Sequence, residues 1–149
     1  NDIDTFLYEY IFVVCNSGIK AQIARKIFNR IIFAMDNGIP IYDVFKNFDK
    51  VNAIYHVWGL KNHYFSEYKK ASDVMKFCGA LPYMGKTIKY HLAKNLGFNC
   101  IKPDRHLIRI ANNYGTDPFK MCDELSKVTR DKVHTIDLVI WRSANLGMI

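Results

Sequence analysis

Long hydrophobic runs are missing from this sequence. Its longest apolar stretches are short, such as residues 11–15, and none approaches the roughly 20 residues that a membrane-spanning helix needs. No signal-peptide pattern, internal repeat, low-complexity segment or linker rich in proline, glycine and serine is visible. These absences lead us to expect no membrane association and no fibrous or disordered chain.

Cysteine is scarce and scattered. The four cysteines, Cys15, Cys78, Cys100 and Cys122, form no Cys-x-x-Cys pair. Structural zinc and iron–sulfur sites need tighter clustering of their ligands. We therefore expect free, mostly buried thiols in a reducing compartment and no metal site.

Strand signals are also poor, and apolar residues recur with the 3.6-residue period of helices. With 149 residues, of which 50% are hydrophobic and 23% charged, the chain can form one domain with a real core. We predict an all-α domain over residues 1–149, with eight or nine short helices. Their expected ranges are 3–15, 19–35, 41–46, 49–57, 63–77, 86–96, 103–113, 117–128 and 131–144. Gly79 and Gly97 are expected to cap two of them, and Pro103 to lie in a first helical turn.

Positive charge is what the chain has in excess. Lysine and arginine number 21 against 14 acidic residues, which gives a net charge of +7, spread over several segments. Such an excess favours an anionic partner, most simply nucleic acid. The alternative is that the charge serves solubility alone.

Residues 63–96 predict two helices joined by a tight link at 79–85, which is a helix–hairpin–helix. Gly85 would let a ligand approach the backbone, and the first amides of the second helix have no partner within it. Lys86 and Lys89 add full charges at the same end. Such a device grips a DNA backbone without reading its sequence. The alternative is an ordinary antiparallel helix pair with a glycine turn.

The segment 81–87, Leu-Pro-Tyr-Met-Gly-Lys-Thr, resembles the Leu-Pro-Gly-Val-Gly-x-Lys hairpin of the helix–hairpin–helix DNA glycosylases, with Tyr83 at the first glycine. Asp104 follows Thr87 by 17 residues, close to the spacing of that family's catalytic aspartate. Residues 84–98 and the Asp-Arg-His at 104–106 are similar to the archaeal 8-oxoguanine glycosylase branch. The four-cysteine iron–sulfur loop of the endonuclease III branch is missing.

This resemblance, which extends to residues 12–17 and 133–147, implies a multi-helix DNA glycosylase fold. It implies double-stranded DNA as the partner, a monomeric protein, and a cytoplasmic or nucleoid-associated location. No organic cofactor is expected, and the family could add a monovalent cation at the hairpin. Tyr83, Gly85, Lys86 and Lys89 would bind DNA phosphate.

Asp104 is the catalytic candidate that the resemblance supplies. A carboxylate below the sugar stabilises the cationic character that develops as a base departs, and it can activate the attacking water. Members that also cleave the strand have a lysine where this chain has Thr87, so we expect hydrolysis without an efficient lyase step. Lys86 lies about 100° away around the predicted helix, and we expect it to reach a phosphate. The alternative for Asp104 is simple stabilisation of a first helical turn.

A flipped base needs stacking and hydrogen bonds to its edge. The speculative candidates for the base pocket or the wedge are Asn16, Ile19, Gln22, His134, Asp137 and Trp141. Asp137 interrupts an apolar run and so needs a partner or a purpose, whereas the helical spacing of Trp141 favours the core. Two rival functions stay open: a non-enzymatic helix–hairpin–helix module that binds DNA, and a base-processing enzyme of a DNA-modification pathway.

Overall fold

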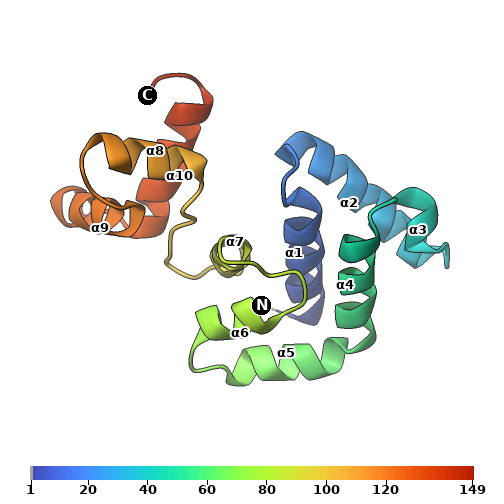
Figure 1. Ribbon diagram of the computed structural model, residues 1–149. Coiled ribbons are helices and arrows are strands. Elements are labelled where there is room, and N and C mark those ends of the chain that lie inside the picture. Colours follow the sequence, from blue (N-terminus) through green and yellow to red (C-terminus); the bar gives the residue numbers. More distant parts are fainter. Residues whose placement is uncertain (1) are drawn as a thin grey trace. The chain divides into compact units, whose positions relative to one another are not determined.

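The computed structural model describes residues 2–149, and all of the regular structure in that range is helical (Figure 1). The ten helices are α1 (Ile3–Asn16), α2 (Ala21–Asp36), α3 (Ile41–Val44), α4 (Phe48–Gly59), α5 (Lys61–Lys70), α6 (Val74–Ala80), α7 (Ile88–Asn95), α8 (Arg105–Asn113), α9 (Pro118–Thr129) and α10 (Val133–Asn145). The predicted all-α class is confirmed. The finer prediction of a glycosylase fold stays a prediction.

The chain divides into two compact units. The first ends at Leu92, and the second runs from Ala93 to Ile149, so that the boundary falls within α7. Each unit has its own buried residues and is described by itself below.

Helix α1 is the central element of the first unit. The Asp2 side chain caps it by accepting a hydrogen bond from the Thr5 backbone N–H at 2.7 Å. Helices α2, α4 and α5 pack against α1 (Figure 1). Asp4, Thr5 and Tyr8 are exposed on one side of α1. The buried residues form a broad face on the other side: Phe6, Leu7, Tyr10, Ile11, Val13, Val14 and Cys15.

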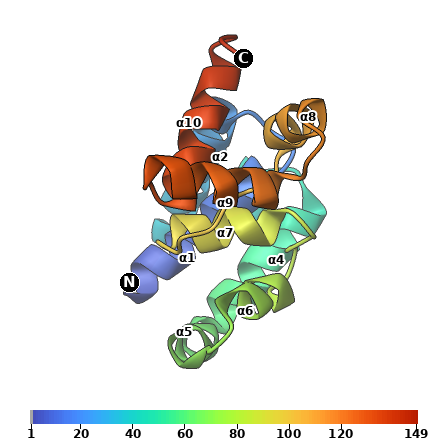
Figure 2. The same cartoon turned by 90° about the vertical axis from the view of Figure 1, so that its left-hand side faces the viewer.

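The predicted helix 63–77 is wrong, because the structure has two helices there, α5 and α6. The Asp73 side chain starts α6 by accepting a hydrogen bond from the Lys76 N–H at 3.0 Å. The Phe6 ring of α1 lies 5.2 Å from Tyr68 of α5 and 6.0 Å from Phe77 of α6, which holds both helices against α1. Figure 2, like Figure 1, shows α6 beside α5.

Gly79 does not cap a helix, as the sequence suggested, but lies inside α6. A Cβ added there would come within 3.2 Å of Cδ of Lys89, so the Lys89 stem crosses α6 at this glycine. The absent side chain therefore leaves room for the Lys89 stem against α6.

In the second unit, α8, α9 and α10 pack around one apolar cluster. Its buried members are Ile101, Leu107, Ile110, Ala111, Met121, Cys122 and Ile136. The start of α8 differs from the prediction, because Pro103 precedes the helix and Asp104 is its N-cap. Helix α9 packs against α10, which carries three of the candidate residues.

Two further observations concern the whole described chain. None of its helices combines the length and the apolar character that crossing a bilayer requires. All four cysteines are free thiols, and three of them are buried, as predicted.

Candidate functional site

The hairpin link between α6 and α7 begins with a turn over Leu81–Met84. The Met84 N–H donates to the Leu81 carbonyl oxygen at 3.2 Å, and Tyr83, third in the turn, has a φ of 66°. Such turns usually place glycine at that position, because a positive φ strains residues that carry a Cβ. Tyr83 thus adopts a backbone conformation that glycine adopts without this strain.

A contact with α1 holds this strained turn. The Tyr10 hydroxyl donates a hydrogen bond to the Pro82 carbonyl oxygen at 2.8 Å. Tyr10 is fully buried, and burial raises the pKa of its hydroxyl well above the usual value. The link is therefore anchored in the core of the first unit by a donor that stays protonated.

The surroundings of Gly85 differ from those of Gly79. It does not have a positive φ, and a Cβ added to it would meet no atom of the described chain within 4 Å. Neither backbone conformation nor packing within the described chain requires glycine at this exposed position. The space beside it is open to a ligand.

The predicted start of the second hairpin helix is wrong by two residues, because α7 begins at Ile88. Lys86 and Thr87 are exposed and lie in the link, and Thr87 accepts a hydrogen bond from the Tyr90 N–H at 3.1 Å. The Lys89 ammonium lies 5.3 Å from the centre of the Tyr90 ring. The link, rather than the helix, therefore carries Lys86 and Thr87.

Lys50 of α4 is the residue that sequence reasoning missed. Its side chain is 2% exposed, and its ammonium donates to the carbonyl oxygens of Cys15 at 3.1 Å and Ser17 at 2.6 Å. Burial lowers the pKa of this ammonium, and the nearby Cys15 opposes that shift. The ammonium also lies 6.0 Å from the Tyr83 ring centre. The signal was its position four residues before Ile54, on the buried face of α4.

The Lys50 contacts fix the segment that carries the predicted wedge residues. Asn16 ends α1, and the Ile19 N–H donates to the Asn16 carbonyl oxygen at 3.1 Å, which brings these two candidates together. Gln22 follows as an exposed residue in the first turn of α2.

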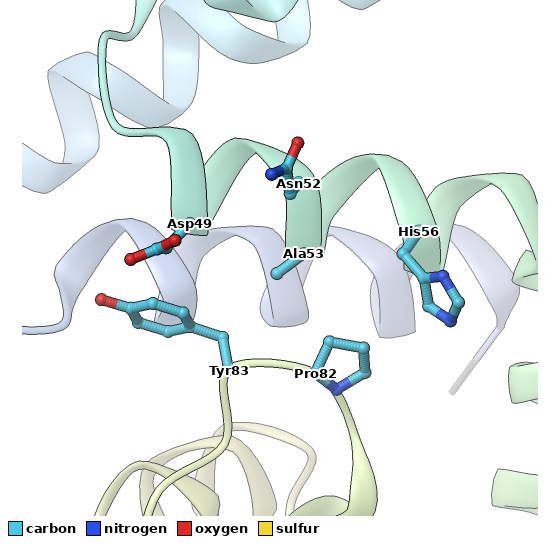
Figure 3. A pocket seen from close by; sticks show the side chains of 6 residues that line it. All are labelled: Asp49, Asn52, Ala53, His56, Pro82 and Tyr83. Atoms are coloured by element: carbon cyan, nitrogen blue, oxygen red, sulfur yellow. The ribbon is translucent and has the colours of Figure 1, made fainter.

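A hollow of 440 Å³ lies beside the hairpin link, within the first unit (Figure 3). Its lining residues come from α4 and from the link: Asp49, Asn52, Ala53, His56, Pro82 and Tyr83. Of these, only Tyr83 was a predicted site residue.

Asp104, in the second unit, caps α8 through one oxygen. Oδ1 accepts hydrogen bonds from the backbone N–H groups of His106 and Leu107, both at 3.0 Å. These bonds fix the carboxylate, which is half-buried, and leave Oδ2 outside the cap. The stabilising role is therefore real, and it occupies only one of the two oxygens.

Asp137 of α10 is 1% exposed and is paired rather than turned to water. Its Oδ2 lies 2.7 Å from the Lys94 ammonium and accepts a hydrogen bond from the Lys102 N–H at 2.8 Å. Burial lowers the pKa of the Lys102 side chain, and Asp104 and Asp137 oppose that shift. The pairing gives Asp137 the partner that a buried carboxylate requires.

His134 and Trp141 lie on the same face of α10 as Asp137, and this face packs on the rest of the second unit. The His134 N–H donates to Oδ1 of Asn99 at 3.2 Å, and its buried Nδ1 has no hydrogen-bond partner among the described residues. Trp141 is partly buried against the apolar cluster, as its helical spacing suggested.

The described part of the chain brings no three His, Cys, Asp or Glu side chains together as a metal-binding group.

No protein-family model matches this chain, and neither a curated protein nor a solved structure matches it.

Proposed function

We propose that this chain is a DNA N-glycosylase of the helix–hairpin–helix kind. It hydrolyses the N-glycosidic bond of a damaged, mispaired or modified base in double-stranded DNA and leaves the strand intact. The observation that carries the proposal is that two features follow each other along the chain at a separation close to that in the family. A hairpin link with an open backbone at Gly85 comes first, and a carboxylate with one free oxygen follows at Asp104.

The hairpin link supplies the grip on DNA. Gly85 leaves room for a phosphate against the backbone, and the ammonium groups of Lys86 and Lys89 lie on either side of Thr87 in the chain. Contacts to phosphate hold a duplex in position and carry no sequence information. Binding through this link should therefore weaken with salt and depend little on sequence.

Asp104 supplies the chemistry. As the C–N bond breaks, the base leaves with the bonding electrons and positive charge develops at C1′ of the sugar. A carboxylate oxygen stabilises that charge and takes the proton of the water whose oxygen bonds to C1′. The two backbone N–H groups at Oδ1 hold the side chain in one orientation, and this leaves Oδ2 for the reaction.

Thr87 explains why the strand stays intact. A lyase step needs an amine that attacks C1′ and forms a Schiff base. Thr87 has no amine, so water is the nucleophile and the product is an abasic site. A covalent complex with abasic DNA that borohydride traps, and that is lost in Lys86→Ala, would contradict this part of the proposal.

The main rival is a non-enzymatic module that binds DNA through the hairpin. The cap on α8 favours it, because two hydrogen bonds account for Asp104 without any substrate. A base-processing role in a DNA-modification pathway would use the same chemistry on a different base.

A panel of duplexes that each contain one lesion or modified base separates these functions. The proposal expects one of them to lose its base with the wild-type chain, and the strand to break only after alkali. Binding to every duplex without base loss would support the rival instead. Strand scission without alkali would contradict the hydrolytic mechanism alone.

A further inference from the structure

The segment that carries Asp104 has no regular structure of its own. Residues 101–104 lie outside the helices, and α8 begins only after them. The Asp104 N–H donates to the Lys102 carbonyl oxygen at 2.7 Å, and the Asp104 carboxylate caps α8. Both contacts join Asp104 to its own neighbours in the chain. They fix its local conformation, and the contacts that hold the segment against the rest of the second unit must come from elsewhere.

Apolar contacts hold the two ends of the segment. Ile101 and Leu107, on either side of it, are buried in the apolar cluster that α8, α9 and α10 share. Burial of apolar surface is non-directional. It draws both ends of the segment toward the cluster, but it does not set the exact position of a carboxylate oxygen between them.

Asp137 supplies a directional contact from α10. Its Oδ2 accepts hydrogen bonds from the Lys102 N–H at 2.8 Å and from the Lys94 ammonium at 2.7 Å. Lys102 thus connects the two aspartates, because its N–H bonds to Asp137 and its carbonyl oxygen accepts the Asp104 N–H. Burial lowers the pKa of the Lys102 ammonium, and the charges of Asp104 and Asp137 oppose this shift, so both carboxylates act on one ammonium.

A carboxylate at this buried position of α10 calls for a reason besides stability. Replacing a buried ion pair by apolar side chains of similar volume is often neutral or stabilising. Apolar side chains at positions 94 and 137 would fill the same space, but they would leave the Lys102 N–H without this acceptor. What the carboxylate adds is therefore a fixed place for that N–H and for the segment that follows it.

We propose that Asp137 is a positioning residue for Asp104. Through the Lys102 N–H it holds segment 102–104 against α10, and it thereby sets where Oδ2 of Asp104 meets the sugar. Lys94 compensates the charge that this arrangement buries. A catalytic group that is displaced by about 1 Å loses about a hundredfold in rate. The effect on the rate rests on the proposed glycosylase function, whereas the positioning of the segment does not.

Two double variants of the full chain differ only in the acceptor. The leucine variant, Lys94→Met with Asp137→Leu, removes both charges and the acceptor. The asparagine variant, Lys94→Met with Asp137→Asn, removes both charges but keeps a side-chain oxygen for the Lys102 N–H. Neither variant leaves a buried charge unpaired, so both should fold, which urea denaturation checks.

Single-turnover base release on the duplex that the wild type processes tests the effect on the reaction. The leucine variant should release the base about a hundredfold more slowly at saturating enzyme, with unchanged affinity for the duplex. The asparagine variant should recover most of that loss, even where it is the less stable of the two. Lys127→Met with Asp123→Leu removes an exposed pair of the same charges on α9, and as the matched control it should keep the wild-type rate.

Amide hydrogen exchange tests the positioning without any activity. The Lys102 and Asp104 amides should exchange faster in the leucine variant than in the wild type, because the segment opens without its contact to α10. In the asparagine variant both amides should exchange at close to the wild-type rate. The amides of α9 should be unchanged in both variants.

Three results would overturn the proposal: wild-type exchange at Asp104 in the leucine variant, equal base release by the leucine variant and the wild type, or equal slowing in both variants. If the wild type releases no base from any duplex, the glycosylase proposal fails. Exchange at Asp104 then still decides whether Asp137 holds the segment, so the two failures are distinguishable.

Discussion

Lys50 in the first unit and Asp137 in the second are the charged side chains buried among the described residues, and their partners differ. The Lys50 ammonium is surrounded by carbonyl oxygens of the main chain, at Cys15 and Ser17. Asp137 has an opposite charge, Lys94, and a backbone N–H. An ion pair compensates a buried charge, whereas carbonyl dipoles bind it to one segment of backbone. The first unit thus uses a charge to fix a loop, and the second uses a pair to join α7 to α10.

Breaking the Lys94–Asp137 pair in the second unit should have the largest effect on stability. Lys94→Met leaves the Asp137 carboxylate buried without its counter-charge, which costs about 3–5 kcal/mol of unfolding free energy. The double variant Lys94→Met, Asp137→Leu should recover most of that loss. Urea denaturation of the three proteins measures both values, and a single-variant loss below about 1 kcal/mol would contradict a compensating pair.

Lys50→Met should cost less, about 1–3 kcal/mol, because it removes the charge together with its donors. What remains is two carbonyl oxygens without a donor. Hydrogen exchange should show faster opening at residues 16–20, while Lys94→Met should leave those amides unchanged. Equal effects of both variants on the loop would remove the distinction between the two buried charges.

Lys50 in the first unit and Cys122 in the second predict opposite dependences of stability on pH. Burial lowers the pKa of Lys50, so the native state releases this proton at a lower pH than the unfolded chain does. The unfolded state then binds more protons, and this group makes unfolding free energy rise with pH through the folded pKa up to 10.5. Burial raises the pKa of Cys122 from 9.0 to about 11, so this group makes stability fall between those values.

Denaturation at several pH values checks these signs by subtraction. Lys50→Met should lack the part of the unfolding free energy that rises with pH in the wild type. Cys122→Ala should lack the part that falls with pH. Identical pH profiles of the wild type and either variant would contradict the corresponding burial effect.

The smallest effect on stability concerns Gly85. Gly85→Ala adds a methyl group to open space and should change unfolding free energy by less than about 0.5 kcal/mol. We expect it to weaken duplex binding about tenfold, equivalent to about 1.4 kcal/mol, because a phosphate approaches there. Gly59→Ala, at the end of α4, is the matched control. A Cβ added to Gly59 also meets no atom within 4 Å, and DNA binding should be unchanged.

Local signals predicted much of the fold. The apolar face of α2 and the glycine after it gave that helix within two residues, and the range 117–128 predicted for the next-to-last helix is within one residue of α9 at each end. The break at residues 71–73 was missed, because it depends on Phe6 packing on rings from both sides of it. The capping residue Asp73 lies in a polar segment, and without the contact to Phe6 its sequence does not indicate that one helix ends and another begins there.

The function of the candidate site stays a prediction, and its residues differ in how clearly the sequence indicates them. The hairpin and Asp104 are encoded by short segments, and Asp137 was noticeable because its neighbours in the chain are apolar. The signal for Lys50 was weak, because it consisted of the four-residue spacing to Ile54 alone and its acceptors belong to residues more than 30 positions away. The hollow was missed for the same reason, since it forms only where the link meets α4.

The most direct test of the central claim compares two N-cap aspartates of the second unit in single-turnover base release. Asp104 caps α8 and Asp117 caps α9, each by accepting backbone N–H bonds, and asparagine caps a helix about as well. On the duplex that the wild type processes, Asp104→Asn should reduce the rate of base release by at least about a hundredfold. Asp117→Asn should leave the rate unchanged. Equal rates for the wild type and Asp104→Asn would contradict the claim that Asp104 performs the chemistry.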